Sequence, residues 1–204
     1  MKKTLVFIII ALFAAILNGC GDKDEKTMYS GAFYSQNLIR CYLDCDEIVL
    51  EGVENWINVL FDGKDYNAVK TPAKFDSLAK VNNDVDYNNM VVGFNESIND
   101  SIFSISIKCD KDIDGAHLAG TELNDLFTFK GKTYYTVIQN HYNKYDADRL
   151  QMSAKDVTPA KTRVMCHYFS LTLDKLPAKS GTYTFDVSIK LSKKTLKNTV
   201  TMEF

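Results

Sequence analysis

The sequence has few of the residues and motifs that mark several common protein classes. It contains three prolines, one tryptophan and three histidines in 204 residues, and no internal repeat or low-complexity stretch. G-x-S-x-G, H-E-x-x-H, Walker and G-x-G-x-x-G motifs are all missing. Their absence removes the usual signals of serine hydrolases, zinc proteases and nucleotide-binding enzymes. We therefore expect a protein that is not an enzyme.

The chain also lacks a strong charge of one sign. Lys and Arg number 24 against 26 Asp and Glu, which gives a formal net charge of −2. This balance does not supply the basic surface that nucleic acid requires, so we expect no nucleic-acid partner. Hydrophobic residues make up 46% and aromatic residues 12% of the chain, which is typical of a globular protein.

One long hydrophobic run is present, and it lies at the N-terminus from Leu5 to Leu17, behind Lys2 and Lys3. As a helix it would be about 20 Å long, short of the ~30 Å hydrocarbon core of a bilayer. This pattern is typical of a signal peptide, which we place at residues 1–19. The run ends in Leu-Asn-Gly-Cys, which resembles the lipobox of bacterial lipoproteins. The resemblance implies cleavage before Cys20, lipidation of its sulfur, and an anchor in the lipid bilayer.

Residues 20–28 follow the predicted cleavage site and are mostly polar and charged, which indicates a short flexible tether. Asp22, Asp24 and Glu25 resemble the acidic export signals of surface lipoproteins in Bacteroides-type bacteria, although a solvated run of charge explains them equally well. We predict a lipid-anchored protein of the bacterial outer membrane and leave periplasmic and surface-facing orientations open. Residues 29–204 are expected to form a single domain.

Four further cysteines follow, at Cys41, Cys45, Cys109 and Cys166. An even number outside the cytoplasm allows two disulfides in any of three pairings. If residues 41–45 lie in a strand, the first two are about 13 Å apart and cannot pair with one another. Four small buried thiols are the alternative. No CxxC or HxxxH pair supports a zinc site.

Alternation of apolar and polar residues recurs along the chain and predicts β-strands. It is clearest in segments 101–109 and 165–173, where Phe103 and His167 are expected on the core faces. Segments 182–191 and 196–204, joined by a polar turn, predict a closing β-hairpin. Further strands are predicted at 48–50, 56–61, 90–94 and 134–139.

Helix signals are few and short. Thr71 before Pro72 predicts the start of a helix over 71–81, and Thr121 predicts another over 121–127. Many strands with one or two short helices indicate an antiparallel immunoglobulin-like β-sandwich. Segment 176–187 is similar to the strand-to-strand corner of immunoglobulin-like domains, with Tyr183 two residues before the core position Phe185. A tyrosine in a plain hairpin is the alternative.

The chain as a whole resembles small lipoproteins of Bacteroides-type bacteria that carry a domain of unknown function. The resemblance rests on the lipobox, on the segment SISIKCDKDIDGAHLAGTELNDLF (104–127) and on the hairpin sequence GTYTFDVSIKLS (181–192). This resemblance implies no particular activity for the chain.

An acidic turn invites comparison with calcium sites. Asp110, Asp112 and Asp114, followed by Gly115, repeat the start of an EF-hand loop. The rest does not match, because the twelfth loop position is Thr121 and a strand precedes the loop. An irregular calcium site with the three aspartates as ligands is one hypothesis. A plain acidic turn is preferred, since Asp and Gly favour turns. No other cofactor is expected.

Tyrosines and amides alternate over residues 134–145. Aromatic faces beside amides suit sugars, which makes Tyr142 and Tyr145 candidate glycan-binding residues, with packing in the core as the alternative. Ser77 and Ser101 lie in Asp-Ser-apolar tripeptides that resemble O-glycosylation sites of Bacteroides-type bacteria.

Together these features predict a membrane-anchored envelope lipoprotein that acts as a non-catalytic binding or assembly component. Its partners would be the bilayer and either a glycan or another envelope protein. A glycan- or calcium-dependent adhesive module is the first alternative. An envelope hydrolase is the second, and would need a cleft holding paired carboxylates or a His-oriented nucleophile.

Overall fold

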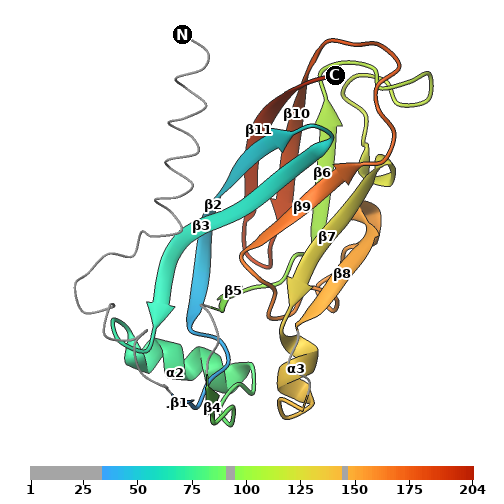
Figure 1. Ribbon diagram of the computed structural model, residues 1–204. Coiled ribbons are helices and arrows are strands. Elements are labelled where there is room, and N and C mark those ends of the chain that lie inside the picture. The colour runs from blue at the N-terminus through green and yellow to red at the C-terminus, as the bar shows by residue number, and fades with distance from the viewer. Residues whose placement is uncertain (1–33, 91–94, 144–146) are drawn as a thin grey trace.

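The computed structural model describes residues 34–90, 95–143 and 147–204, and in these ranges the chain forms a β-sandwich (Figure 1). The strands are β1 (Tyr34–Ser35), β2 (Cys41–Val53), β3 (Trp56–Asn67), β4 (Asn89–Met90), β5 (Glu96–Ile98), β6 (Ser104–Cys109), β7 (Phe127–Thr133), β8 (Asp148–Ser153), β9 (Tyr168–Leu173), β10 (Thr182–Lys190) and β11 (Thr195–Glu203). The helices are α2 (Pro72–Val81) and α3 (Tyr135–Gln139), with 3₁₀ turns η2 (Asn124–Leu126) and η3 (Ala154–Asp156). The predicted β-sandwich is confirmed. The signal peptide, Cys20, the tether and residues 91–94 of a predicted strand lie outside the described residues.

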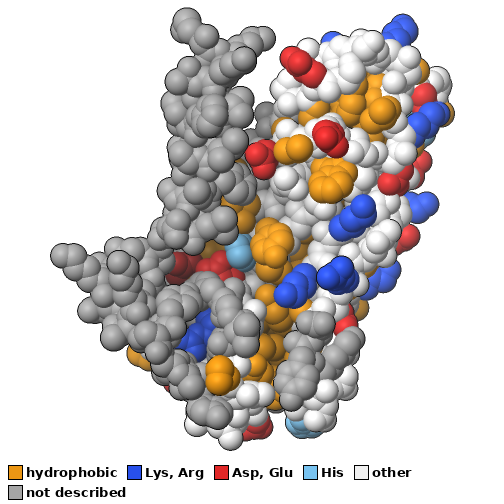
Figure 2. Space-filling view, viewed as in Figure 1, with side chains coloured by type: hydrophobic (Ala, Val, Ile, Leu, Met, Phe, Trp, Pro, Cys, Tyr) orange, Lys and Arg blue, Asp and Glu red, His pale blue; other side chains and the backbone are white. Residues whose placement is uncertain are grey.

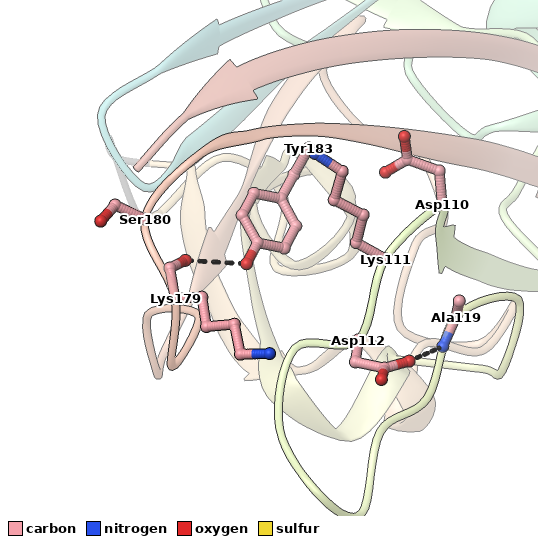
Figure 3. Close-up of a pocket in the computed structure, with 7 residues that line it drawn as sticks. All are labelled: Asp110, Lys111, Asp112, Ala119, Lys179, Ser180 and Tyr183. Carbon is pink, nitrogen blue, oxygen red and sulfur yellow. Dashed lines mark hydrogen bonds between the residues drawn. The ribbon is translucent and has the colours of Figure 1, made fainter.

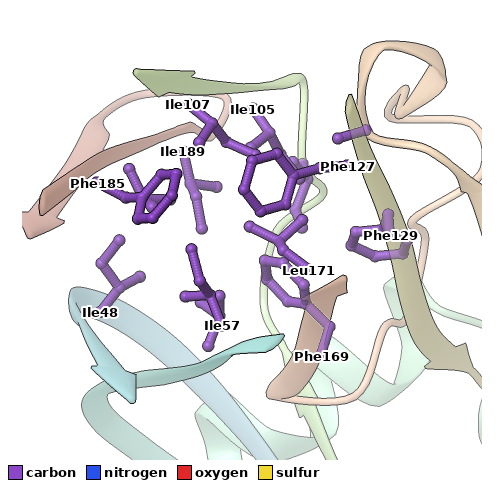
Figure 4. Close-up of a cluster of buried hydrophobic side chains, with 14 of the residues drawn as sticks. Ile48, Ile57, Ile105, Ile107, Phe127, Phe129, Phe169, Leu171, Phe185 and Ile189 are labelled. Atoms are coloured by element: carbon purple, nitrogen blue, oxygen red, sulfur yellow. The ribbon is translucent and has the colours of Figure 1, made fainter. Parts of the chain in front are cut away.

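Two sheets face one another across the core. One has six strands in the order β5-β2-β3-β9-β7-β8, and the other has three in the order β11-β10-β6. Neighbours are antiparallel except for β2 with β5. Alternate side chains of both sheets meet in one buried cluster, in which the rings of Phe127 and Phe185 lie edge to face at 5.8 Å (Figure 4). Burial of each such large apolar side chain contributes about 1.5–3 kcal/mol.

The closing hairpin forms as predicted. β10 pairs with β11 over its full length, and alternate residues from Tyr183 to Leu191 are buried. The Tyr183 hydroxyl donates to the Lys179 carbonyl at 2.7 Å. A hydrogen bond from a tyrosine to the backbone a few residues upstream is the contact found in tyrosine corners. Asn198 interrupts the apolar face of β11 because its amide donates across to the Ile48 carbonyl of the other sheet at 2.8 Å.

A second hydrophobic cluster lies at the end of the sandwich where both helices sit (Figure 1). Helix α2 begins at Pro72 as predicted and packs Phe75 and Leu78 into this cluster. Thr71 does not cap the helix with its side chain. Its hydroxyl instead accepts from the Asn67 backbone N–H and donates to the Asn67 carbonyl, which closes the turn between β3 and α2.

Asp84 joins the segment after α2 to the segment before β2. Its side chain is completely buried and accepts hydrogen bonds from the backbone N–H groups of Leu38 and Ile39, both at 2.8 Å. The Tyr142 hydroxyl donates to the same carboxylate at 2.9 Å. Burial raises the pKa of Asp84, and the two backbone donors act in the opposite direction. One side chain thus satisfies buried donors from two distant parts of the chain.

Two predicted elements were wrong. Residues 134–139 were expected as a strand, but they contain helix α3, because Val137 and Ile138 are both buried and a strand would send one of two neighbours outward. Residues 121–127 were expected as a helix, but contain only η2 before β7 begins. The Asn124 side chain binds the edge of β6, donating to the Ile105 carbonyl and accepting from the Ile107 N–H, which fixes η2 against that strand.

Two predicted core positions also differ. Phe103 is 43% exposed because β6 starts one residue later, at Ser104. His167 precedes β9 and is only half-buried, since its ring pairs with the carboxylate of Glu96.

Replacing Asp84 with Ala would leave two buried backbone N–H groups without their acceptor. We expect the free energy of unfolding, measured by urea titration, to fall by roughly 3 kcal/mol. Asp86→Ala, at an exposed position two residues away, is the matched control and should change stability by less than about 0.5 kcal/mol. Equal effects of the two substitutions would contradict this role for Asp84.

Candidate functional site

The three carboxylates of the acidic turn bind backbone and side-chain donors both within the turn and on neighbouring segments. Asp110 accepts from the Thr184 N–H at 2.8 Å and Asp112 from the Ala119 N–H at 2.7 Å. Asp114 contacts the His117 ring at 2.8 Å and the Lys175 ammonium at 3.0 Å. Lys175 first, and then His117, hold the pKa of Asp114 well below its usual range, and Asp114 in turn raises the pKa of His117.

This turn borders a shallow hollow of about 460 Å³ (Figure 3). Its lining mixes both signs of charge, with Asp110, Lys111, Asp112, Ala119, Lys179, Ser180 and Tyr183. In Figure 3 the carboxylates of Asp110 and Asp112 lie apart, and no group of three potential ligands in the described ranges is placed to hold a metal ion. The hydrogen bonds of the three carboxylates are those expected of an acidic turn, and the calcium hypothesis stays a prediction.

The four cysteines of the domain are free thiols, all buried. The possible disulfides of Cys41, Cys45, Cys109 and Cys166 stay a prediction. In the structure the sulfurs of Cys41 and Cys45 contact the carbonyls of Tyr42 and Leu43 at 3.9 and 3.7 Å. Burial raises the pKa of Cys41 and of Cys45 to about 12 and that of Cys109 to about 11. These groups remain thiols at neutral pH, which fits the alternative of four small core residues.

The remaining predicted residues do not assemble into one site. Tyr142 is half-buried, its hydroxyl bonded to Asp84 and its ring edge-on to Tyr87 at 5.2 Å, so it serves packing rather than stacking on a sugar. Tyr145 lies outside the described residues. Ser77 is exposed on α2, and Ser101 lies in the turn after β5; their glycosylation stays a prediction.

A different surface carries exposed aromatic rings. Ile57 of β3 and Phe169 of β9 point into the core, so their neighbours must point outward. Trp56 and Tyr168 are consequently 47% and 54% exposed. We call the outward-pointing side chains of β3, β9, β7 and β8 the outer face. Figure 2 shows hydrophobic side chains beside Lys and Arg side chains over these strands.

A polar row crosses the outer face. Asn58 on β3 pairs with Ser170 on β9, Ser170 pairs with Lys130 on β7, and Lys130 pairs with Gln151 on β8. The row therefore offers amide, hydroxyl and ammonium groups on four successive strands.

The two exposed rings lie on opposite sides of the polar row. Trp56 is two residues before Asn58 on β3, whereas Tyr168 is paired with Leu60, two residues after it. At about 3.3 Å per residue the rings are separated by roughly 13 Å along the strands. A ligand that contacts both rings must therefore be elongated.

Positive charge gathers at one side of the outer face. Lys132 of β7 is directly opposite Arg149 of β8, and like charges in that position repel. The Lys130 ammonium lies 5.8 Å from the centroid of the Trp56 ring. Within the described ranges none of the three cations forms an ion pair with a carboxylate. The strands thus hold cations together without neutralising them.

A histidine–carboxylate pair lies beside Tyr168. The His167 Nδ1 is 3.0 Å from a Glu96 carboxylate oxygen, and its ring is edge-on to Tyr168 at 5.3 Å. Burial raises the pKa of Glu96 to about 7, with Asp65 acting in the same direction. Burial also lowers the pKa of His167, against the effect of Asp65. The contact distance alone would fit an ion pair, but burial disfavours both charges.

No protein-family model matches the chain, and no curated protein or solved structure is significantly similar to it. In the described part of the chain, neither helix is long and apolar enough to cross a membrane.

The sequence did contain a signal for the outer face. Trp56, Asn58 and Leu60 occupy every second position, as do Lys130 and Lys132, so the outward residues could be read from each strand alone. What the sequence could not supply is that β3, β9 and β7 are neighbours.

Replacing Glu96 with Gln should change how stability depends on pH. The folded-state pKa of Glu96 lies above its ordinary value of 4.5, so its ionisation costs stability as the pH rises from 4.5 towards 7. Glu96→Gln has no such cost. Relative to the wild type, the variant should gain about 2 kcal/mol of unfolding free energy between pH 4.5 and pH 7. Urea titrations at both pH values measure it, and a difference that does not vary with pH would contradict the shift.

Proposed function

We propose that this protein is a lipid-anchored, non-catalytic binding protein of a bacterial envelope, and that it binds its ligand on the outer face. The single observation that carries the proposal is the exposure of Trp56 and Tyr168 on adjacent interior strands of a sheet with a packed core beneath it. Exposed aromatic side chains on a rigid scaffold are typical of binding surfaces. The lipobox-like segment ending at Cys20 supports the anchor.

The arrangement near Cys166 supports a non-catalytic role. The Cys166 sulfur lies 4.0 Å from His167 Nδ1, the same nitrogen that contacts Glu96 at 3.0 Å. In a nucleophile–base–carboxylate triad the imidazole uses one nitrogen for the nucleophile and the other for the carboxylate. Cys166 is also buried, and burial raises the pKa of its thiol, so it lacks the exposed thiolate that such chemistry requires.

The anchor is tested by metabolic labelling with palmitate. The wild-type protein should incorporate the label and start at Cys20, as read by mass spectrometry of the mature N-terminus. Cys20→Ala should lose the label while keeping its four other cysteines, which makes those cysteines an internal control. A labelled Cys20→Ala protein, or an unlabelled wild type that retains Met1, would contradict the anchor.

The binding surface is tested by co-sedimentation with purified envelope fragments. The mature chain carrying Cys20→Ser is used, so that lipid does not mediate the interaction. Trp56→Ala and Tyr168→Ala should each reduce the bound fraction at least fivefold, because each removes an exposed ring at the proposed contact. Phe103→Ala, which removes a similarly exposed ring outside the six-stranded sheet, should bind as the wild type does. Retention of full binding by both outer-face variants would overturn the assignment.

A further inference from the structure

We propose that the ligand of the outer face is an acidic glycan, an extended chain of sugar rings that carry carboxylate groups. The inference rests on the proposed function of this face as the binding surface and adds the chemical class of the ligand. Three features of the face carry it, namely the spacing of the rings, the polar row between them and the unneutralised cations beside them.

The rings fit a chain of flat, partly apolar units. Trp56 and Tyr168 are each about half exposed, and their neighbours Ile57 and Phe169 are locked in the core. The backbone that presents the rings is therefore ordered before binding, which lowers the entropy cost of association. Sugar rings present C–H faces that pack on aromatic rings, and a separation of roughly 13 Å between them along the strands requires several linked sugars.

The polar row lies where the hydroxyl groups of such a chain would be. Ser170 and Gln151 provide hydroxyl and amide groups that can both donate and accept hydrogen bonds. The Asn58 amide already donates to the Glu51 carboxylate at 3.4 Å, which leaves its carbonyl oxygen to accept from a sugar hydroxyl. This row argues against a lipid bilayer as the occupant, since burying these groups in hydrocarbon without partners is costly. It also argues against an acidic peptide. Peptides commonly bind by adding a strand at a sheet edge, and the edge strand of this face is β8. A strand added beside β8 would lie about 14 Å from β9 and would not reach the rings of Trp56 and Tyr168.

The cations require that the glycan be acidic. Lys132 and Arg149 oppose one another in register, and the Lys132 ammonium lies 5.2 Å from the centroid of the Tyr134 ring. Like charges on directly opposite residues repel, and an anion placed between them would relieve that repulsion. Lys130 adds a third positive charge next to Trp56. A neutral glycan would stack on the rings but leave this repulsion in place.

The test compares two oligosaccharides that differ only in charge. An oligogalacturonate and its carboxyl-reduced counterpart of equal length are titrated into the mature chain carrying Cys20→Ser, with the affinity measured by calorimetry. The acidic form should bind at least tenfold more tightly, with an affinity that falls as salt is added. Alginate oligosaccharides and heparin extend the panel to other acidic sugars, while polyglutamate and anionic phospholipid vesicles represent the other anionic occupants.

Substitutions then locate the contact. Trp56→Ala and Tyr168→Ala should weaken binding at least fivefold, and Phe103→Ala should not. Arg149→Gln should weaken binding to the acidic form, reduce its salt dependence, and raise the thermal midpoint of the unliganded protein because the repulsion with Lys132 is gone. Lys197→Gln, an exposed cation on β11, is the matched control and should leave affinity unchanged.

Four results would overturn the acidic-glycan inference. The co-sedimentation experiment shows whether the proposed binding surface fails with it. Equal affinity for the acidic and reduced oligosaccharides would show a neutral-glycan surface. Binding of polyglutamate or vesicles in place of the acidic sugars would show a different ligand class. If no acidic sugar binds while envelope binding still requires Trp56, the acidic glycan is wrong and the surface assignment stands. If envelope binding does not require Trp56, both fail.

Discussion

The structure depends on one constraint, the filling of a single core by alternate side chains of two facing sheets. Each inward residue of β3, β9 and β7, such as Ile57, Phe169 or Phe129, is held by its neighbours in the core. Because strand side chains alternate, fixing one face fixes the other. A register slip of one residue would expose the core residues and bury Trp56 and Lys130. The core thereby determines where every outer-face group lies.

The helical end of the molecule is also held by buried packing, but it contributes no side chain to the outer face. Asp84 binds the segment before β2, and Tyr142 and α2 pack in the same region. The His167–Glu96 pair connects this end to Tyr168. The candidate surface is thus bounded by this half-buried polar pair at one end and by Trp56 at the other. Its groups are positioned by packing rather than by loops, which suits a surface that binds without large rearrangement.

Much of the fold could be predicted from the sequence, because the strands of the closing hairpin alternate strictly and α2 has Pro72 at its first turn. Helix α3 could not be predicted, since Tyr, Thr, Val and Ile favour strands and only tertiary packing buries Val137 and Ile138 together. The aspartates of the acidic turn resemble metal ligands in sequence, yet Asp112 binds its own loop and Asp110 binds the backbone of β10. No local sequence motif marks the outer face. The strands that carry Trp56, Lys130 and Tyr168 are far apart in the chain and become neighbours only in the folded sheet.

The central claim is that the ligand lies on the outer face of the six-stranded sheet. Backbone amide chemical shifts, recorded by NMR on the mature Cys20→Ser chain before and after addition of soluble envelope glycan, test it most directly. The account predicts the largest changes in β3, β9 and β7, at Asn58, Ser170 and Lys130 and in the indole N–H of Trp56. Changes concentrated instead around Asp110, Asp112 and Lys179 would place the ligand in the hollow beside the acidic turn and contradict the claim.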